Sequence, residues 1–328
     1  MTIQSVPVVS GPSGCAPVRP ANSVRRTSTV DMSWVDGFGS QLRLDGRSRD
    51  ALTHDPADAP EVLRAATMNA GIGLGRTIQD ISATPTPANL QRLVGCSGGG
   101  RLRGALEQHL PDELANGTPL YLLLDDISGT SLISGFVWSR WMKNWMKDPD
   151  ATRQGPNMAG VCIGFAPGSA NMDENGVPAQ GHEVQPVVSL VNPQDPHGWH
   201  ERPDPPKVFM CRARRIDVWV DDHEIHIDSA FQDTAGDPEF GRIAVHEYLL
   251  RATADRATGR ITTLDPDPRV LPYATCPGAV ARARELVGTP LADLRSVVLD
   301  RLAKTNGCTH LNDALRALAE VPILIDYL

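Results

Sequence analysis

The chain has 328 residues, which is enough for about two domains that each bury a core of their own. Its formal net charge of -8 argues against a nucleic-acid surface or an anionic membrane as the main partner. No segment approaches the roughly 18 apolar residues that a membrane span needs, and the N-terminus lacks a secretory-type apolar segment. We therefore expect a cytoplasmic protein whose partner is a small molecule.

Residues 1–24 predict a leader that is disordered or ordered only on contact, because they are rich in Ser, Pro, Val and Gly without a period. Residues 25–136 alternate in short strand-like runs and close on the apolar segment Leu120–Leu124, which ends in Asp125-Asp126. Residues 137–207 combine a Trp/Met-rich helix with a Pro/Gly-rich connector, and 208–328 form the last unit.

The last unit has strand-like composition at 213–220, 224–231, 244–255 and 260–264, with turn signals between the strands. Helical patterns follow at 277–287, 290–304 and 309–318. Strands in sequence followed by helices predict an antiparallel meander with helices packed on one face, which is an α+β unit.

The first unit resembles the last in order and approximate spacing. Arg25-Arg26 corresponds to Arg214-Arg215, Leu93–Gly95 to Leu286–Gly288, and Asn116-Gly117 to Asn306-Gly307. The alternative is a chance alignment of common turn and strand residues. We interpret the pattern as an internal duplication into two related α+β units, of which only the second carries candidate ligand residues.

In residues 136–147 the aromatic and Met side chains recur every three or four positions, which is typical of one helix face. Such a helix would pack between the two units or in a homo-oligomer interface. Alternatively, Trp138 and Trp141 would form an apolar wall over a substrate cavity. In the connector, Trp199 and His200 are either solvated loop residues or face the same site.

Candidate metal ligands gather in the last unit. His246-Glu247 lies in a strand, Cys276 precedes a helix, and Cys308-Thr309-His310 opens the last helix. Thiolate and imidazole are the preferred ligands of zinc and are common for iron. Neighbouring strand residues point to opposite faces, so at most one of His246 and Glu247 enters the site, and we favour His246. For the remaining cysteines Cys15, Cys96 and Cys211 we expect buried, unreactive thiols.

Further polar residues could act beside these ligands. Asp228 and Asp233 flank Phe231 and would serve acid–base work, or pair with Arg214 and Arg215. Asp313 could orient His310. The full candidate set is therefore Glu247, His310 and Asp313 for catalysis; His246, Cys276, Cys308 and His310 for a metal; and Trp138, Trp141, Trp199, His200, Arg214, Arg215 and Asp228 for substrate.

Several of these residues stand in the specific motif Gly307-Cys-Thr-His-Leu-Asn-Asp313, together with Val245–Tyr248 and Cys276. Over nearly the whole chain this pattern resembles the bacterial domain of unknown function 2889 family, a resemblance that implies no activity. From Glu247 onward the order of elements is also similar to U-type iron-sulfur cluster assembly scaffolds. That similarity implies ligands at Glu247 or His246, at Cys276, and at Cys308 with His310.

The chain departs from the scaffold pattern in two ways: the scaffold's first Cys has no counterpart, and its adjacent His-Cys pair becomes Cys308-Thr309-His310. These departures favour a single zinc or iron ion over cluster assembly. Such an ion would polarise a carbonyl or activate water. The expected function is a metal- or thiol-dependent lyase or hydrolase that acts on an apolar or aromatic catabolic intermediate without a redox cofactor. The alternatives are a metal or iron-sulfur carrier and a non-catalytic protein with a structural zinc site.

Overall fold

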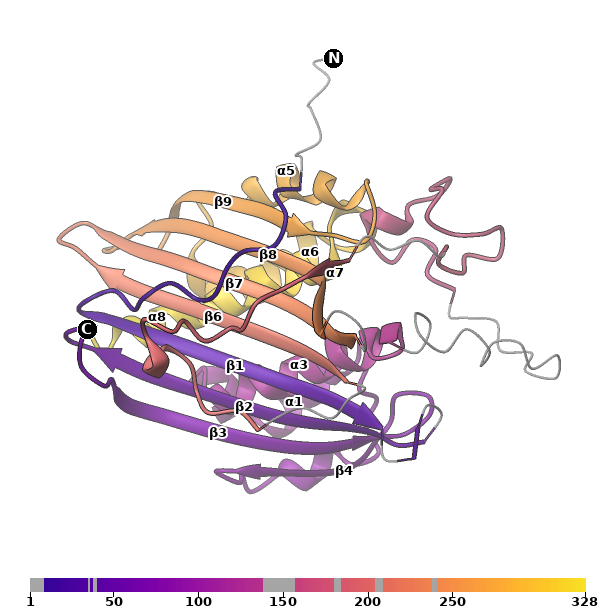
Figure 1. Cartoon of the computed structure of the whole chain (residues 1–328), viewed down its shortest axis with the longest axis horizontal. Helices are drawn as coiled ribbons and strands as arrows, with labels where there is room; N and C mark the ends of the chain where they lie inside the picture. The colour runs from indigo at the N-terminus through magenta and orange to yellow at the C-terminus, as the bar shows by residue number, and fades with distance from the viewer. Residues whose placement is uncertain are drawn as a thin grey trace, which may run out of the picture.

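The computed structural model describes residues 9–34, 36–37, 40–137, 157–179, 184–203, 209–237 and 241–328. One antiparallel sheet of nine strands runs through the molecule (Figure 1). The strands are β1 (Ser23–Trp34), β2 (Leu42–Thr53), β3 (Glu61–Ile72), β4 (Ile78–Thr84), β5 (Gln185–Pro186), β6 (Met210–Val220), β7 (Glu224–Asp237), β8 (Gly241–Asp255) and β9 (Ile261–Val270). The predicted α+β class and antiparallel pairing are confirmed.

The sheet contains two four-stranded meanders, β1–β4 and β6–β9, joined through their first strands. β1 pairs with β6, and Arg26 lies opposite Ile216 in this pairing. The short strand β5 pairs with β8. Burial in β2 alternates between buried and half-buried residues, whereas β1 and β6 are buried along nearly their whole length. The central strands are therefore covered on both faces, and polar groups placed there must find partners within the protein.

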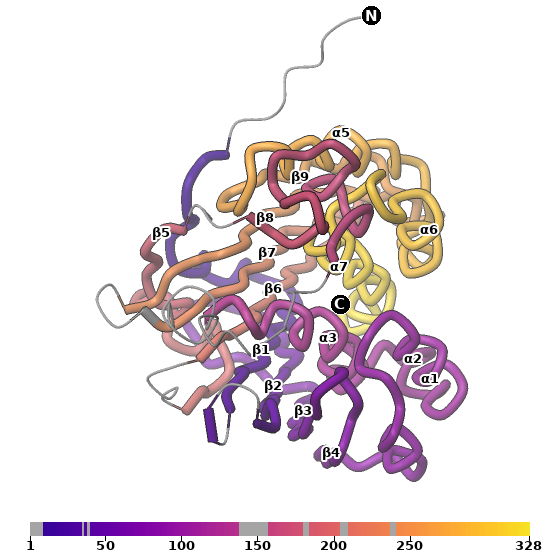
Figure 2. The backbone as a smooth tube through the Cα atoms, turned by 90° about the vertical axis from the view of Figure 1, so that its right-hand side faces the viewer, coloured from indigo at the N-terminus to yellow at the C-terminus, as the bar shows by residue number. Residues whose placement is uncertain are grey.

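The helices of the two halves cover one face of the sheet (Figure 2). They are α1 (Leu102–His109), α2 (Pro111–Ala115), α3 (Pro119–Ile133), α5 (Ala279–Arg284), α6 (Leu294–Arg301), α7 (Thr309–Ala317) and α8 (Val321–Ile325). The Thr118 hydroxyl caps α3 by accepting a hydrogen bond from the Tyr121 N–H, and Pro119 suits the first turn. The apolar run 120–124 therefore lies within a helix, and α3 contacts α7. Among the described residues, none of the helices has the length and apolar character needed to cross a membrane.

Two extended segments, residues 9–22 and 187–202, cross the opposite face of the sheet (Figure 1). The buried ion pair between Arg19 and Asp195, with N–O 3.0 Å, joins one segment to the other. Ser13 also donates its backbone N–H to Glu247 on β8. From residue 9 onward the expected leader is therefore packed against the sheet. The remaining predicted unit boundaries stay predictions.

Candidate metal centre

Three side chains from different elements converge on the helix-covered face: Asp233 of β7, His246 of β8 and His310 of α7. We call them the His–Asp cluster. One potential ligand atom from each lies within 4.8 Å of the other two. His246 Nδ1 is 3.4 Å and His310 Nε2 is 3.7 Å from the same oxygen, Asp233 Oδ2. A single carboxylate oxygen therefore faces two imidazole nitrogens.

Local structure explains this convergence. Asp233 and His246 are direct partners in the β7–β8 pairing, so their side chains share a face. The pairing shifts register immediately afterwards, between Asp233 and Thr234, and such bulges alter the direction of neighbouring side chains. His310 lies in the first turn of α7, which begins at Thr309. Its ring stacks on that of His246, with centroids 3.4 Å apart and planes 16° from parallel.

Arg212 of β6 fixes the Asp233 carboxylate with two hydrogen bonds, Nε to Oδ1 at 2.8 Å and Nη2 to Oδ2 at 3.0 Å. Burial acts to raise the pKa of Asp233, but the charge and hydrogen bonds of Arg212 hold this pKa below its usual range. Asp233 is therefore an anion. Each carboxylate oxygen has more than one acceptor direction, so Oδ2 can bind a cation beside the guanidinium.

Further charges from the helices surround Arg212. Its Nη1 contacts Asp126 of α3 at 3.2 Å and Asp313 of α7 at 3.0 Å. Arg214 donates from Nε to Asp126 at 2.8 Å. Both guanidinium groups lie over the Phe231 ring, at 4.7 and 4.8 Å from its centroid. The cluster is thus held by a network that ties β6 and β7 to α3 and α7.

The two imidazoles of the cluster have open nitrogen positions. His246 is 8 % exposed, and its Nδ1 is buried without a partner of good hydrogen-bond geometry among the described residues. Burial lowers the pKa of His310 well below its usual value, and the nearby His246 adds to the shift. A neutral imidazole has a nitrogen lone pair for a metal, and buried polar nitrogens normally have a partner.

The expected thiol ligands lie beside this cluster rather than in it. Cys308 Sγ is 3.9 Å from His310 Nδ1, whereas the ligand group within 4.8 Å contains no cysteine among the described residues. Cys276 Sγ and Cys162 Sγ both flank Gly164: a Cβ placed on this glycine would lie 3.2 and 3.6 Å from them. Cys276 and Cys308 both belong to the apolar core cluster that includes residues of α5. Cys276 therefore lies near Cys308 but outside the group of ligand atoms formed by Asp233 and the two histidines.

We call Cys162, Cys276 and Cys308 the thiol cluster. Burial raises the pKa of Cys276 and Cys308, and it raises that of Cys162 to about 11. The neighbouring Cys308 adds to the shift at both Cys162 and Cys276. These groups are protonated thiols at neutral pH in the absence of a cation.

The predicted catalytic residue Glu247 is not brought together with His310. It follows His246 in a strand and therefore points to the opposite face, where it accepts hydrogen bonds from the Ser13 N–H at 2.9 Å and from Gln232 at 3.2 Å. Burial raises its pKa. Asp313 contacts Arg212 and Arg103 at 3.0 Å each, so it positions these guanidinium groups instead of His310.

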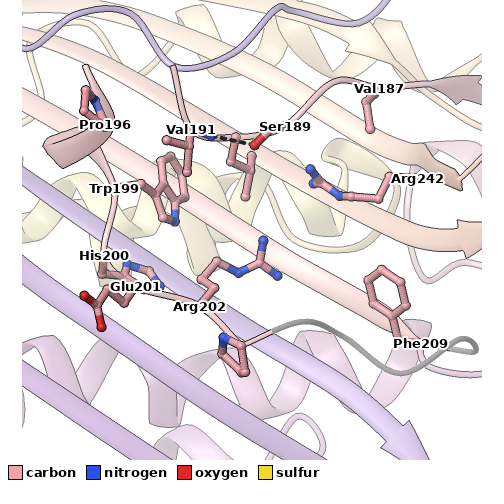
Figure 3. A pocket seen from close by; sticks show the side chains of 12 residues that line it. Val187, Ser189, Val191, Pro196, Trp199, His200, Glu201, Arg202, Phe209 and Arg242 are labelled. Atoms are coloured by element: carbon pink, nitrogen blue, oxygen red, sulfur yellow. Dashed lines mark hydrogen bonds between the residues drawn. The ribbon is translucent and has the colours of Figure 1, made fainter. Parts of the chain in front are cut away.

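The predicted substrate residues are scattered. Arg214 lies beside the cluster, whereas Arg215 and Asp228 bind each other on the opposite face. Trp138 and Trp141 lie outside the described residues. Trp199 and His200 line a cavity on the opposite face (Figure 3).

His200 has a structural role in that cavity wall. Its two ring nitrogens lie 2.8 Å from the hydroxyls of Thr27 and Thr29. Burial, with a contribution from the Arg202 charge, lowers the pKa of His200 to about 3. This histidine is therefore neutral, and both nitrogens already have partners on β1.

Sequence reasoning missed three residues. Arg212 was not singled out, Asp233 was considered for acid–base work or for pairing with Arg214 and Arg215 but not as a metal ligand, and Cys162 was given no role. The alternation of charged residues on β6 would have indicated Arg212, because residues 212 and 214 share a face. Asp233 could be identified only once the register of β7 against β8 was known. Cys162 could be identified only once the path of the connector was known.

Residues 210–324 match the model of a family described as "Protein of unknown function (DUF2889)". The matched region runs from β6 to α8 and includes the whole His–Asp cluster. No curated protein and no solved structure is significantly similar to the chain. The match supports the family resemblance for this region, and the similarity to iron-sulfur scaffolds is not shown.

Proposed function

We propose that the protein is a metal-dependent lyase or hydrolase of a small molecule, with one zinc or iron ion bound by Asp233, His246 and His310. The observation that carries the proposal is a buried carboxylate oxygen that faces two imidazole nitrogens, one of them without a hydrogen-bond partner. Two histidines and one carboxylate form the ligand set of many zinc hydrolases and of non-haem iron(II) centres. Three protein ligands leave coordination positions for water or substrate.

Such an ion supplies Lewis acidity, which polarises a carbonyl or lowers the pKa of water. The surrounding protein charges favour an anion at its open position. The carboxylates of Asp125, Asp126, Asp233 and Asp313 are matched by the guanidinium groups of Arg103, Arg212, Arg214 and Arg316. A divalent cation would add charge that these groups do not balance, so hydroxide or an anionic substrate group would complete the site.

The substrate class is proposed from sequence. Residues 136–147 follow α3, the helix that contributes Asp126 to the network, and their aromatic and Met side chains recur with helical spacing. This pattern favours an apolar or aromatic substrate over a sugar or a nucleotide.

A second candidate function follows from the thiol cluster. Cys162, Cys276 and Cys308 are buried, and Cys308 is close enough to raise the pKa of both other thiols. Thiolates bind zinc and iron-sulfur clusters, so these residues support a structural zinc site or a metal carrier instead of a catalytic ion.

Metal analysis of the full chain, purified without added metal, separates the two functions. We expect about one zinc or iron per chain, lost in His246→Gln and in His310→Gln but retained in Cys276→Ser. The metal-loaded protein should then cleave members of a panel of aromatic esters or carbonyl compounds, and the two histidine variants should not. Metal that is lost in Cys276→Ser and retained in His246→Gln would instead support the carrier or the structural site.

We also propose that the two meanders with their helices are copies of one ancestral unit. Corresponding turns support this: Gly95 and Gly288 have φ of 87° and 86°. The Gly95 N–H donates to Ile78 O and the Gly288 N–H to Ile261 O, both at 2.8 Å. In this account the first copy serves as a scaffold, because the described His–Asp cluster belongs to the second alone.

A further inference from the structure

A cavity of about 670 Å³ lies on the sheet face opposite α3 and α7, beneath the segment 187–202 (Figure 3). Its walls come from that segment, from Phe209 just before β6, and from Arg242 near the start of β8. The apolar part is formed by Leu190, Val191, Trp199 and Phe209. The charged part is formed by Arg202, Arg242 and Glu201, and Figure 3 shows that the Glu201 carboxylate points away from the two guanidinium groups. The sheet separates this cavity from the His–Asp cluster. A ligand bound in the cavity would therefore not contact the proposed metal centre.

Arg242 lacks a carboxylate partner among the described residues. Its guanidinium donates to Val188 O and to Gln232 Oε1, both at 3.1 Å, and its Nε is buried without an acceptor. Burial lowers its pKa, and the charge of Arg202 adds to this, whereas the nearby Cys211, Asp31 and Glu247 act to raise it. A half-buried cation that is bound only by neutral oxygens is stabilised by an anion.

Arg202 adds a second donor group on the same cavity. Its Nη2 contacts Asp31 at 2.8 Å, whereas its Nε has no acceptor among the described residues. Figure 3 shows that the guanidinium groups of Arg202 and Arg242 both point toward the centre of the cavity. Two planar guanidinium groups that converge in this way suit a carboxylate, which accepts paired hydrogen bonds.

The apolar wall carries its own unsatisfied donor. Trp199 is only 5 % exposed, yet its indole Nε1–H is buried and has no acceptor in the described part of the chain. A buried indole N–H normally finds a partner. His200 cannot supply one, because both its nitrogens face threonine hydroxyls. An acceptor brought by a ligand would satisfy the indole.

We propose that this cavity binds a small organic carboxylate with an apolar or aromatic body, whose carboxylate lies against Arg242 and Arg202 and whose body lies against Trp199 and Phe209. The apolar wall formed by Leu190, Val191, Trp199 and Phe209 favours this ligand over inorganic phosphate, which has no apolar body to pack there. None of the described residues that line the cavity is a lysine.

Calorimetric titration of the full chain with benzoate tests the proposal, with benzamide as the neutral probe of the same shape. We expect benzoate to bind at least about tenfold more tightly than benzamide, because charge-assisted hydrogen bonds are lost with the charge. Arg242→Gln should weaken benzoate binding by about 10- to 100-fold, and Arg242→Lys by less. Arg251→Gln is the matched control, since Arg251 lies on the same strand and its side chain is 74 % exposed.

Circular dichroism and thermal melting establish that each variant is folded before it is titrated. The proposal is overturned if benzoate shows no binding up to its solubility limit. It is equally overturned if benzamide binds as tightly as benzoate, or if folded Arg242→Gln binds benzoate like the unmodified protein. Trp199→Phe keeps an aromatic ring, although a smaller one than the indole, and removes the N–H. Benzoate binding that is weakened in Trp199→Phe more than benzamide binding supports the role of the indole donor.

Discussion

The imidazole rings of His246 and His310 stack with their centroids 3.4 Å apart, although one residue lies in a strand and the other opens a helix. Two protonated imidazoles at this distance would repel each other. Neutral rings avoid this repulsion, and Asp233 Oδ2 lies near a nitrogen of each ring. Because an imidazole lone pair lies in the plane of its ring, binding of one ion by both histidines requires one of the rings to turn out of the stack. The proposed metal centre therefore depends on the packing of α7 against β8, which brings the two histidines together.

Arg212→Met should destabilise the protein by about 3–5 kcal/mol, because it leaves buried carboxylates without their cation. Asp233 would lose both of its guanidinium hydrogen bonds, and Asp126 and Asp313 one contact each. Urea denaturation measures the change. The exposed control Arg251→Met should stay within about 0.5 kcal/mol of the unmodified protein. Equal stability of the two variants would show that the network does not hold the fold.

Cys276→Ser should keep the bound metal and lower the free energy of unfolding by about 1–3 kcal/mol, because it places a hydroxyl in an apolar core. Cys276 is buried beneath α5, outside the group of ligand atoms within 4.8 Å. Metal content and urea denaturation are measured on the same preparation. Loss of metal with unchanged stability would assign the ion to the thiols.

His200 predicts a specific pH dependence of stability. Its pKa is about 3 in the folded protein against an ordinary value of 6.5, so between these values the unfolded chain binds a proton that the folded chain does not. Stability should therefore fall as the pH drops from about 6.5 toward 3, by up to about 1.4 kcal/mol per pH unit from this group. In His200→Gln the decline should be shallower, as followed by urea midpoints across this range. Parallel curves for the two proteins would contradict the assignment.

Gly95→Ala and Gly288→Ala should each cost roughly 1 kcal/mol, because both glycines have positive φ and a side chain is disfavoured there. A Cβ at either position meets no atom within 4 Å, so strain in the backbone is the only cost. Thermal denaturation of the two variants measures the loss of stability that each substitution causes. Clearly unequal costs would weaken the proposed correspondence of the two turns.

The sequence predicted those parts of the site that depend on local structure. The alternation of side chains along a strand predicted that His246 and Glu247 point to opposite faces. The helical pattern of α7 predicted that His310 lies at a helix start. Asp233 joins them only through the register of β7 against β8, which no local pattern specifies. Cys276 was correctly placed at a helix start, yet its side chain enters the apolar core, a direction that depends on how α5 packs.

The fold could be predicted from the sequence to about the same extent as the site. Strand-like composition and turn residues predicted the antiparallel meanders and the helices that follow them. The joining of β1 to β6, and hence the single sheet, depends on contacts between distant segments. The burial of Arg212 follows from the same joining, because a central strand is covered on both faces.

Crystals of the full chain grown with zinc, measured with X-rays above and below the zinc absorption edge, test the central claim most directly. We predict one anomalous peak bounded by Asp233 Oδ2, a nitrogen of His246 and Nε2 of His310, at about 2.0–2.2 Å from each. A peak among Cys162, Cys276 and Cys308 instead, or no peak near the two histidines in crystals that contain zinc, would contradict the account.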